Sequence, residues 1–359
     1  MGSKIDEKIF RLYKRKRVLV TGDTGFKGSW LSLWLHELGA RVVGYALPPA
    51  QKLNHFSLLR LDRKIRHING DIRDFTRLRK LFLDFQPEFL FHLAAQPIVR
   101  ISYKEPKLTF DTNVGGFVNA LEAARITPSL KVAIFVTSDK CYKNEERVQG
   151  YREHDELGGH DPYGASKASA ELAFAAYQTS FFNGRDRLGS ASVRAGNVIG
   201  GGDWSPDRIL PDCIRSLEKR EPIVLRNPNA TRPWQHVLEP LYAYLFLGAK
   251  LYHEPKRYSS SWNFAPDSES VHTVKDLARK VLKYWGEGQI KLANSRKKEL
   301  PEDKILQLNC DKAHRLLGWY PRWDFDRAVS ETVRWYKKVA GDKPALAMTR
   351  GQIRNYMES

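Results

Sequence analysis

The stretch VLVTGDTGFKG, residues 18–28, decides the fold of this chain. Its first three residues are apolar and predict a short buried strand, and three glycines follow with the spacing GxxGxxG. Glycines let a backbone turn sharply and approach a phosphate closely, while the helix expected after the turn points free N–H groups at the same place. Because strand, turn and helix are expected in this order, the stretch predicts the pyrophosphate-binding βα unit of a dinucleotide site.

The rest of the first half continues the alternation of strand and helix. Predicted strands are residues 18–20, 41–46, 89–93, 132–137 and 192–194. Residues 29–38 and 113–124 carry apolar side chains at helical spacing between them. Successive βαβ units build a parallel sheet covered by helices. The expected fold class is therefore α/β, a Rossmann-like doubly wound parallel sheet with a smaller mixed α/β lobe after it.

The regular pattern ends near residue 196. Three consecutive glycines, residues 200–202, and scattered prolines interrupt the chain beyond that point, without a flexible linker or a repeat. We therefore expect a dinucleotide-binding domain over residues 1–196 and a substrate-binding lobe over residues 197–341, with some chain crossing back. Residues 342–359 are weakly patterned and are expected to form a mobile C-terminal tail.

Composition excludes several classes of protein. The chain has 359 residues, and its 59 Lys and Arg against 41 Asp and Glu give a net charge of +18. Three scattered cysteines are too few for a disulfide framework or a thiolate zinc site. We therefore expect a reducing compartment and no bound metal. The N-terminal segment lacks the apolar core of a signal peptide, and the longest apolar run, residues 241–249, is too short to cross a membrane. A cytoplasmic protein without membrane contact is expected.

Two further motifs carry chemistry. Tyr163 and Lys167 form YxxxK, which on a helix places the phenol and the ammonium on one face. A neighbouring cation lowers the pKa of a phenol, so Tyr163 is a candidate base near neutral pH. Ser138, Asp139 and Lys140 follow the predicted strand 132–137, at the sheet edge where ligands of parallel sheets bind.

The pattern TGxxGFxG together with YxxxK resembles the extended, nucleotide-sugar-modifying branch of the short-chain dehydrogenase/reductases, over most of the chain. The resemblance implies NAD as cofactor, although residues 44–47 carry neither the acid typical of NAD sites nor an arginine for a 2′-phosphate. The cofactor-binding residues that it implies are Gly22, Thr24, Gly25, Phe26, Lys27, Gly28, Asp71, Ile72, Ala94, Ala95, Asn113, Tyr163 and Lys167.

Within that branch, the triplet Ser138-Asp139-Lys140 is the more specific feature. Relatives that epimerise C4 follow the serine with small or neutral residues, whereas 4,6-dehydratases follow it with an acid and a base, usually Asp then Glu. The Asp-Lys version, with residues 201–212 and 230–240, resembles the CDP-D-glucose 4,6-dehydratase family. The resemblance implies oxidation at C4, loss of water across C5 and C6, and hydride return to C6, a hydro-lyase reaction of deoxysugar and O-antigen biosynthesis.

The same resemblance assigns roles. Tyr163 would remove the C4 hydroxyl proton, Asp139 would protonate the departing C6 hydroxyl, and Lys140 would act either as the C5 base or as an electrostatic stabiliser of the enolate. A homodimer is expected, through the helix after Lys107 and the helix with Tyr163, and a tetramer stays open. The residues expected to bind CDP-glucose are Gln96, Arg194, Asn197, Arg208, Arg226 and Arg232.

Other functions compete with this one. Another nucleotide-sugar 4,6-dehydratase or a 4-epimerase is the nearest alternative, and a non-catalytic RNA-binding or NAD-binding scaffold is the alternative from another class. A scaffold would not need the YxxxK pair and Asp139. Most of the excess positive charge lies in residues 1–20, 60–80 and 291–359, away from nearly all motifs. The charge therefore predicts a solvated surface rather than a nucleic-acid partner.

Overall fold

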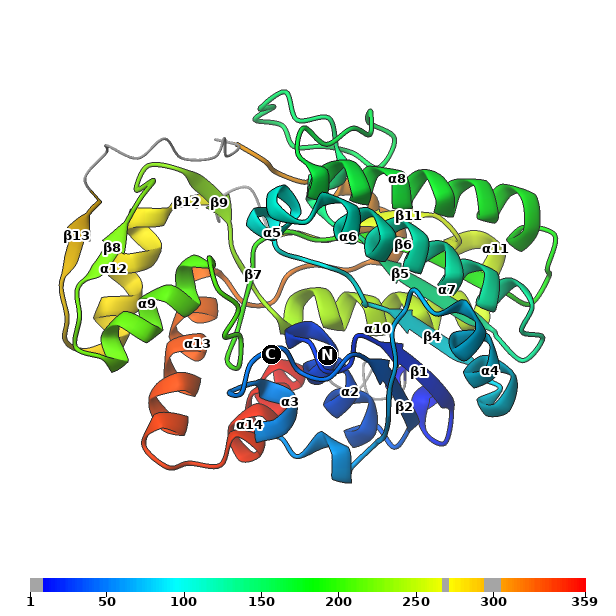
Figure 1. Cartoon of the computed structure of the whole chain (residues 1–359), viewed down its shortest axis with the longest axis horizontal. Helices are drawn as coiled ribbons and strands as arrows, with labels where there is room; N and C mark the ends of the chain where they lie inside the picture. Colours follow the sequence, from blue (N-terminus) through cyan, green and yellow to red (C-terminus); the bar gives the residue numbers. More distant parts are fainter. Residues whose placement is uncertain (1–8, 267–270, 294–304) are drawn as a thin grey trace.

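The computed structural model describes residues 9–266, 271–293 and 305–359. A seven-stranded parallel sheet forms the centre of the molecule, in the order β11-β6-β5-β4-β1-β2-β3 (Figure 1). Its strands are β1 (Arg17–Thr21), β2 (Arg41–Ala46), β3 (Arg66–Asn69), β4 (Phe89–His92), β5 (Val132–Val136), β6 (Gly189–Arg194) and β11 (Ser261–Asn263). The strand order reverses direction between β1 and β4, and such a switch point opens a crevice at the carboxyl ends of the strands.

Both faces of the central strands β1, β4 and β5 are buried, which is why these strands are nearly continuous apolar runs rather than alternating ones. Val18 and Val20 pack into one core with α2 and α10, whereas Leu19 between them packs into a second core with α4, α7 and α8. The helices around the sheet are α2 (Phe26–Glu37), α3 (His55–Leu58), α4 (Phe75–Phe85), α5 (Val99–Lys104), α6 (Pro106–Phe110), α7 (Gly116–Arg125), α8 (Pro162–Tyr177), α10 (Leu238–His253) and α11 (Pro255–Tyr258).

The predicted α/β fold class and the five predicted strands are confirmed, with ends that differ by up to three residues. Helix α2 begins at Phe26 instead of residue 29, so the glycine turn runs directly into its first turn. Two strands of the sheet were not predicted. β3 is a polar, mostly half-exposed edge strand, and β11 has only three residues and comes from beyond residue 196.

Short elements form the remainder of the chain. Three two-stranded pairs join β7 (Val198–Ile199) to β10 (Gln235–His236), β8 (Ile223–Leu225) to β13 (Ile290–Leu292), and β9 (Thr231–Pro233) to β12 (Val271–Thr273). Helices α9 (Ile209–Glu218), α12 (Val274–Trp285) and α13 (Phe325–Ala340) pack beside them (Figure 1). The division into two domains at residue 196 stays a prediction.

The expectation of a mobile C-terminal tail is wrong, because residues 345–358 form helix α14 (Ala345–Glu358), which packs against α2, α3 and α13. Thr349, Ile353 and Tyr356 are buried and follow the spacing i, i+4, i+7 on one helix face. The Tyr356 hydroxyl donates to Glu239 Oε2 at 2.6 Å. Because one of these three side chains is polar and another is a tyrosine, the apolar face of this helix is hard to recognise in the sequence.

In the part of the chain that the structure describes, no helix combines the length and the apolarity that crossing a membrane requires.

Candidate active site

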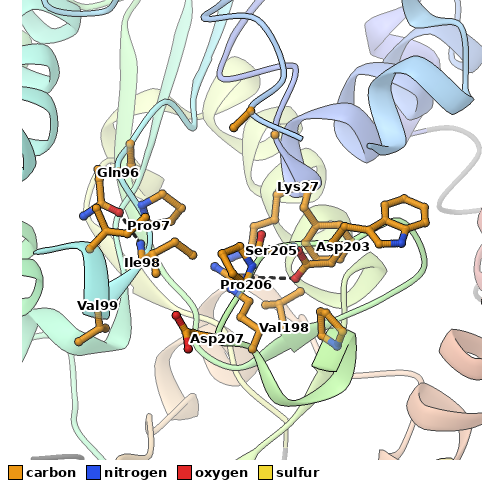
Figure 2. A pocket seen from close by; sticks show the side chains of 18 of the residues that line it. Lys27, Gln96, Pro97, Ile98, Val99, Val198, Asp203, Ser205, Pro206 and Asp207 are labelled. Carbon is orange, nitrogen blue, oxygen red and sulfur yellow. Dashed lines mark hydrogen bonds and ion pairs between the residues drawn. The ribbon is translucent and has the colours of Figure 1, made fainter. Parts of the chain in front are cut away.

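A cavity of about 1240 Å³ opens at the carboxyl ends of β1, β4 and β5 and continues along the segment 195–234 (Figure 2). All five predicted catalytic residues line it. The predicted cofactor residues on its wall are Gly22, Thr24, Gly25, Phe26, Lys27, Gly28, Asp71, Ile72, Ala94, Ala95, Tyr163 and Lys167. The predicted substrate residues on its wall are Gln96, Asn197, Arg208, Arg226 and Arg232.

The glycine turn forms one end of the cavity. Gly22 has φ +77°, and a Cβ there would lie 2.7 Å from the Ala94 backbone nitrogen, so only glycine fits. Gly25 at the N-cap of α2 has no side chain, which leaves the first N–H groups of the helix available to an anion. The turn thus has the geometry of a pyrophosphate site.

Asp71 lies further along the same wall and is held by a residue that the sequence interpretation missed. The Arg73 guanidinium donates to both Asp71 carboxylate oxygens, at 3.0 Å and 2.6 Å, and holds the pKa of that carboxyl below its usual value. The Tyr45 hydroxyl donates to the Asp71 carbonyl at 3.0 Å. Arg73 could have been found from the sequence, because it lies two residues after Asp71, the expected adenine contact. Its guanidinium is engaged by the Asp71 carboxylate.

Tyr163 and Lys167 project from the first turns of α8 into the cavity wall, and both are almost fully buried. Burial raises the pKa of Tyr163 to about 12, although a hydrogen bond with Ser138 lowers it. Burial also lowers the pKa of Lys167 to about 8. The net shift is therefore opposite to the lowering expected from Lys167: Lys167 Nζ lies 6.0 Å from the phenol ring centre, and the effect of burial is the larger one.

The triplet after β5 places a carboxylate beside that phenol. The Ser138 hydroxyl donates to Asp139 Oδ1 at 2.8 Å, and the Lys140 backbone N–H donates to the same oxygen at 3.0 Å. Asp139 is 5% exposed, and a Cβ at Gly196 would lie 2.0 Å from its Oδ2, so glycine is required there. Lys140 Nζ lies 3.9 Å from Asp161, the N-cap residue of α8.

Two predicted ligand contacts are wrong. Arg194 does not line the cavity: its guanidinium is 3% exposed and donates to Glu171 at 2.7 Å and to the Tyr142 hydroxyl at 2.5 Å. Asn113 is also buried behind the wall, where it accepts from the Gln96 backbone N–H at 2.7 Å. Alternation along β6 and the packing of the 111–115 turn direct these side chains away from the cavity.

Asn113 instead supports a residue that does line it. The Asn113 side chain brackets the Gln96 backbone, donating to its carbonyl at 3.0 Å and to Ser166 Oγ at 2.9 Å. The Gln96 side chain is itself engaged, donating to Thr109 Oγ1 at 2.9 Å and accepting from the Ile98 N–H at 2.7 Å. Its amide therefore stiffens the loop after β4.

Two of the arginines predicted for the substrate side, Arg208 and Arg226, are paired with carboxylates that sequence reasoning did not identify. Arg208 Nη1 lies 3.3 Å from buried Asp203. Arg226 and a further cavity residue, Arg100, lie 3.6 Å and 3.7 Å from the same oxygen of Asp207. Arg100 lies in α5, the first helix after β4, and this place beyond the carboxyl end of a sheet strand is the signal that could have found it. Cationic groups therefore line this end of the cavity.

Chemically, the cavity combines a dinucleotide-type turn, a phenol, a carboxylate with an adjoining lysine, and arginines suited to phosphate groups. Among the described residues, no group of three or more His, Cys, Asp and Glu side chains could hold a metal ion.

Comparison with known proteins identifies the family. The model of the family described as GDP-mannose 4,6 dehydratase matches residues 19–332. A curated CDP-glucose 4,6-dehydratase of Salmonella typhimurium is 45% identical over 351 residues, which cover 97% of this chain and 98% of the relative. A dTDP-glucose 4,6-dehydratase of Xanthomonas campestris is 26% identical, over 89% of this chain and 92% of the relative.

Solved structures share the fold. The dTDP-glucose 4,6-dehydratase of Streptomyces venezuelae, with NAD bound, superposes with a TM-score of 0.75 at 24% identity, over 92% of this chain and 99% of the other. The UDP-glucose 4-epimerase of Thermotoga maritima gives a TM-score of 0.77 at 23% identity, over 90% and 99%. Since the family model spans most of the chain and the Salmonella relative matches almost all of it, this chain belongs to the GDP-mannose 4,6-dehydratase family of extended short-chain dehydrogenase/reductase enzymes.

Proposed function

We propose that this chain is an NAD-dependent CDP-glucose 4,6-dehydratase that produces CDP-4-keto-6-deoxyglucose. The observation that carries the proposal is the placement of Asp139 in the cavity wall, hydrogen-bonded to Ser138 and facing the same space as Tyr163. A C4 epimerase needs the phenol and the serine alone, whereas loss of water from C6 also needs a proton donor. The 45% identity to a CDP-glucose 4,6-dehydratase supports CDP as the nucleotide.

NAD fits the residues that line the cofactor side. The glycine turn with the free start of α2 would hold the pyrophosphate, Asp71 and Ile72 the adenine end, and Lys167 the nicotinamide ribose. Arg73 is already neutralised by Asp71, which disfavours a 2′-phosphate and supports NAD over NADP. When bound, NAD supplies the hydride acceptor at C4 and the hydride donor at C6.

The chain's own residues move the protons. Tyr163 removes the proton of the C4 hydroxyl, which Ser138 orients. A C4 ketone acidifies the C5 hydrogen, which a base, with Lys140 as the candidate, removes as a proton. Asp139, in its protonated form, delivers a proton to the departing C6 hydroxyl, so one water leaves. Burial raises the pKa of Tyr163 to about 12 even though Arg208 lowers it, so deprotonation near neutral pH requires further positive charge, which the oxidised nicotinamide would bring.

Lys140 has two open roles, the C5 base and the stabiliser of the enolate. Its contact with Asp161 anchors the side chain to the start of α8, beside Tyr163. The variants Lys140→Met and Lys140→Glu separate the roles. If Lys140 is the base, Lys140→Met loses exchange of the C5 hydrogen with solvent and Lys140→Glu keeps part of it. Retained exchange in Lys140→Met would eliminate the base role.

The whole function is tested by incubating the protein with NAD and, separately, CDP-glucose, dTDP-glucose, UDP-glucose and GDP-mannose, and measuring products by mass. The expected result is loss of one water from CDP-glucose, with NAD unchanged in net amount. A C4 epimer of unchanged mass would favour the epimerase, and no product from any sugar would favour a binding protein. Asp139→Asn provides the matched control, since it keeps the shape and removes the proton.

We also propose a homodimer in the cytoplasm. The helices expected to pair carry exposed apolar side chains, Phe110 at the end of α6 and Leu172 on α8. The three cysteines are free and buried, which favours a reducing compartment. Sedimentation of Leu172→Glu against the unmodified protein tests the dimer: the variant is expected to sediment as a monomer, and an unchanged dimer would exclude this interface.

A further inference from the structure

Lys27 occupies an unusual position between the two halves of the cavity. It is the second residue of α2, and its side chain lies in the cavity beside the segment that carries Asp203 and Ser205 (Figure 2). Among the residues that the structure describes, none accepts a hydrogen bond from its ammonium and none forms an ion pair with it. Lys27 therefore brings a basic group into the cavity without a hydrogen-bond or ion-pair partner among the described residues.

The charges around Lys27 make this arrangement costly. The charged groups that act on it are Arg208, Asp139 and Lys167, of which two are cations. Burial, followed by Arg208, lowers the pKa of Lys27 to about 7. An ammonium among cations in a partly desolvated site is stabilised when an anion arrives. The cluster thus has the chemistry of a diphosphate site.

Two diphosphates are candidates, the one in the cofactor and the one in the substrate. The adenine end of the cofactor side is marked by Asp71 and Arg73, and neither is among the groups acting on Lys27. Its neighbours are instead Asp139 of the catalytic triplet and Arg208 of the segment 203–208. The Lys27 side chain is thus close enough to Asp139 and Arg208 for their charges to act on it, which favours the diphosphate of the substrate.

We propose that the Lys27 ammonium, together with Arg208, binds the diphosphate of the nucleotide-sugar substrate. One short segment, residues 22–28, then serves the cofactor with its backbone N–H groups and the substrate with a side chain. The inference rests on the proposed function only in that the substrate is a nucleoside diphosphate sugar. It adds Lys27 to the substrate-binding residues, where the sequence had assigned it to the cofactor.

The experiment measures binding instead of turnover. Calorimetric titration of CDP, UDP and dTDP, each into protein saturated with NAD, is carried out on the unmodified protein, Lys27→Met and Lys27→Arg. Lys27→Met is expected to weaken CDP binding about 10- to 100-fold, the range for loss of one charge-assisted hydrogen bond. Lys27→Arg is expected to recover most of the affinity. Lys80→Met, at an exposed lysine that does not line the cavity, controls for loss of overall charge and is expected to change affinity less than about threefold.

Two further measurements identify the ligand. NAD affinity in Lys27→Met is expected to stay within about threefold, a change worth roughly 0.6 kcal/mol. Because the substrate anion raises the pKa of an ammonium that titrates near 7, CDP binding at pH 7.5 is expected to take up part of a proton, measured as a dependence of the binding heat on buffer ionisation. Lys27→Met is expected to abolish that uptake.

The outcomes are distinct. Unchanged CDP affinity in Lys27→Met, or a loss of NAD affinity as large as the loss for CDP, overturns the proposal. Equal affinities for CDP, UDP and dTDP in the unmodified protein, with all three weakened by Lys27→Met, would support Lys27 and remove support for cytidine as the preferred base.

Discussion

Two groups of basic side chains differ in how they are built, one buried behind the residues that line the cavity and one facing the cavity. Behind the wall, Arg194 meets Glu171, and Glu171 also accepts from Ser192 at 2.8 Å. In front of the wall, Lys27 has no partner among the described residues and Arg208 shares a single longer contact of 3.3 Å.

The difference teaches which cations bind ligands. A buried charge whose hydrogen bonds are satisfied within the protein is committed to the fold, because removing either partner leaves the other uncompensated. A cation that faces a cavity and is only partly compensated keeps binding energy for a ligand. From the sequence, both Arg194 and Arg208 were assigned to the substrate. Only their hydrogen-bond and ion-pair partners in the structure show that Arg194 stabilises the fold and that Arg208 is available to a ligand.

The largest expected effect lies behind the wall. Glu171→Gln leaves Arg194 buried beside a neutral amide and is expected to lower the free energy of unfolding by about 3–5 kcal/mol, measured by chemical denaturation. The double variant Glu171→Leu with Arg194→Met is expected to recover much of this loss. If the double variant is as unstable as the sum of two single variants, the pair is not the unit that we describe.

The same pair predicts acid sensitivity. Burial raises the pKa of Glu171, but the charge and hydrogen bonds of Arg194 outweigh burial and hold that pKa below its usual value. A carboxyl with a lowered pKa stabilises the fold above the unfolded-state pKa of about 4.3, and that stability is lost as the pH falls through the folded-state value. Denaturation between pH 6 and pH 3 is expected to be steeper in the unmodified protein than in the double variant.

In front of the wall, the expected effect is on binding. Arg208→Met is expected to weaken CDP binding about 10- to 100-fold, as for a charge-assisted phosphate contact, while the free energy of unfolding changes by about 1 kcal/mol. Titration and denaturation of the same preparation test both halves. Arg257→Met, at an exposed arginine paired with Glu254, is the control expected to leave CDP affinity unchanged. A large loss of stability with unchanged CDP affinity would place Arg208 with Arg194.

The smallest effect concerns a second satisfied charge. Buried Glu239 accepts from the Tyr356 hydroxyl and from the backbone N–H groups of Arg322 and Trp323, and burial raises its pKa to about 7. Tyr356→Phe removes one of these donors and is expected to cost about 1 kcal/mol of unfolding free energy, measured by thermal denaturation. No loss in the variant would show that α14 is held by apolar packing alone.

The sequence predicted what is encoded locally. The glycine turn and the YxxxK motif each lie within one short stretch of sequence, so spacing alone places their residues relative to one another without knowledge of the tertiary fold. The role of Arg194 could not be predicted in this way, because its partner lies 23 residues earlier on another element. A signal was present, since Glu171 continues the i, i+4 spacing of Tyr163 and Lys167 along α8, and a carboxylate there requires a cation.

Polar side chains also concealed structure. Helix α14 and the edge strand β3 lack a strong apolar pattern: α14 packs against α2 and α3, which are distant in sequence, and β3 is held by its pairing with β2. Conversely, the pKa of Tyr163 was misjudged because spacing reports that a lysine is on the same helix face and does not report burial.

The strand β11 has a consequence for how the chain folds. It is added to the free edge of β6 by residues that follow β6 by more than 60 positions, so this edge cannot be covered until the chain has been synthesised beyond Asn263. Contacts of such long sequence separation slow folding, and an uncovered strand edge pairs readily with other chains. A fragment that ends at residue 196 is accordingly expected to aggregate, and expression studies of this chain are best designed around its full length.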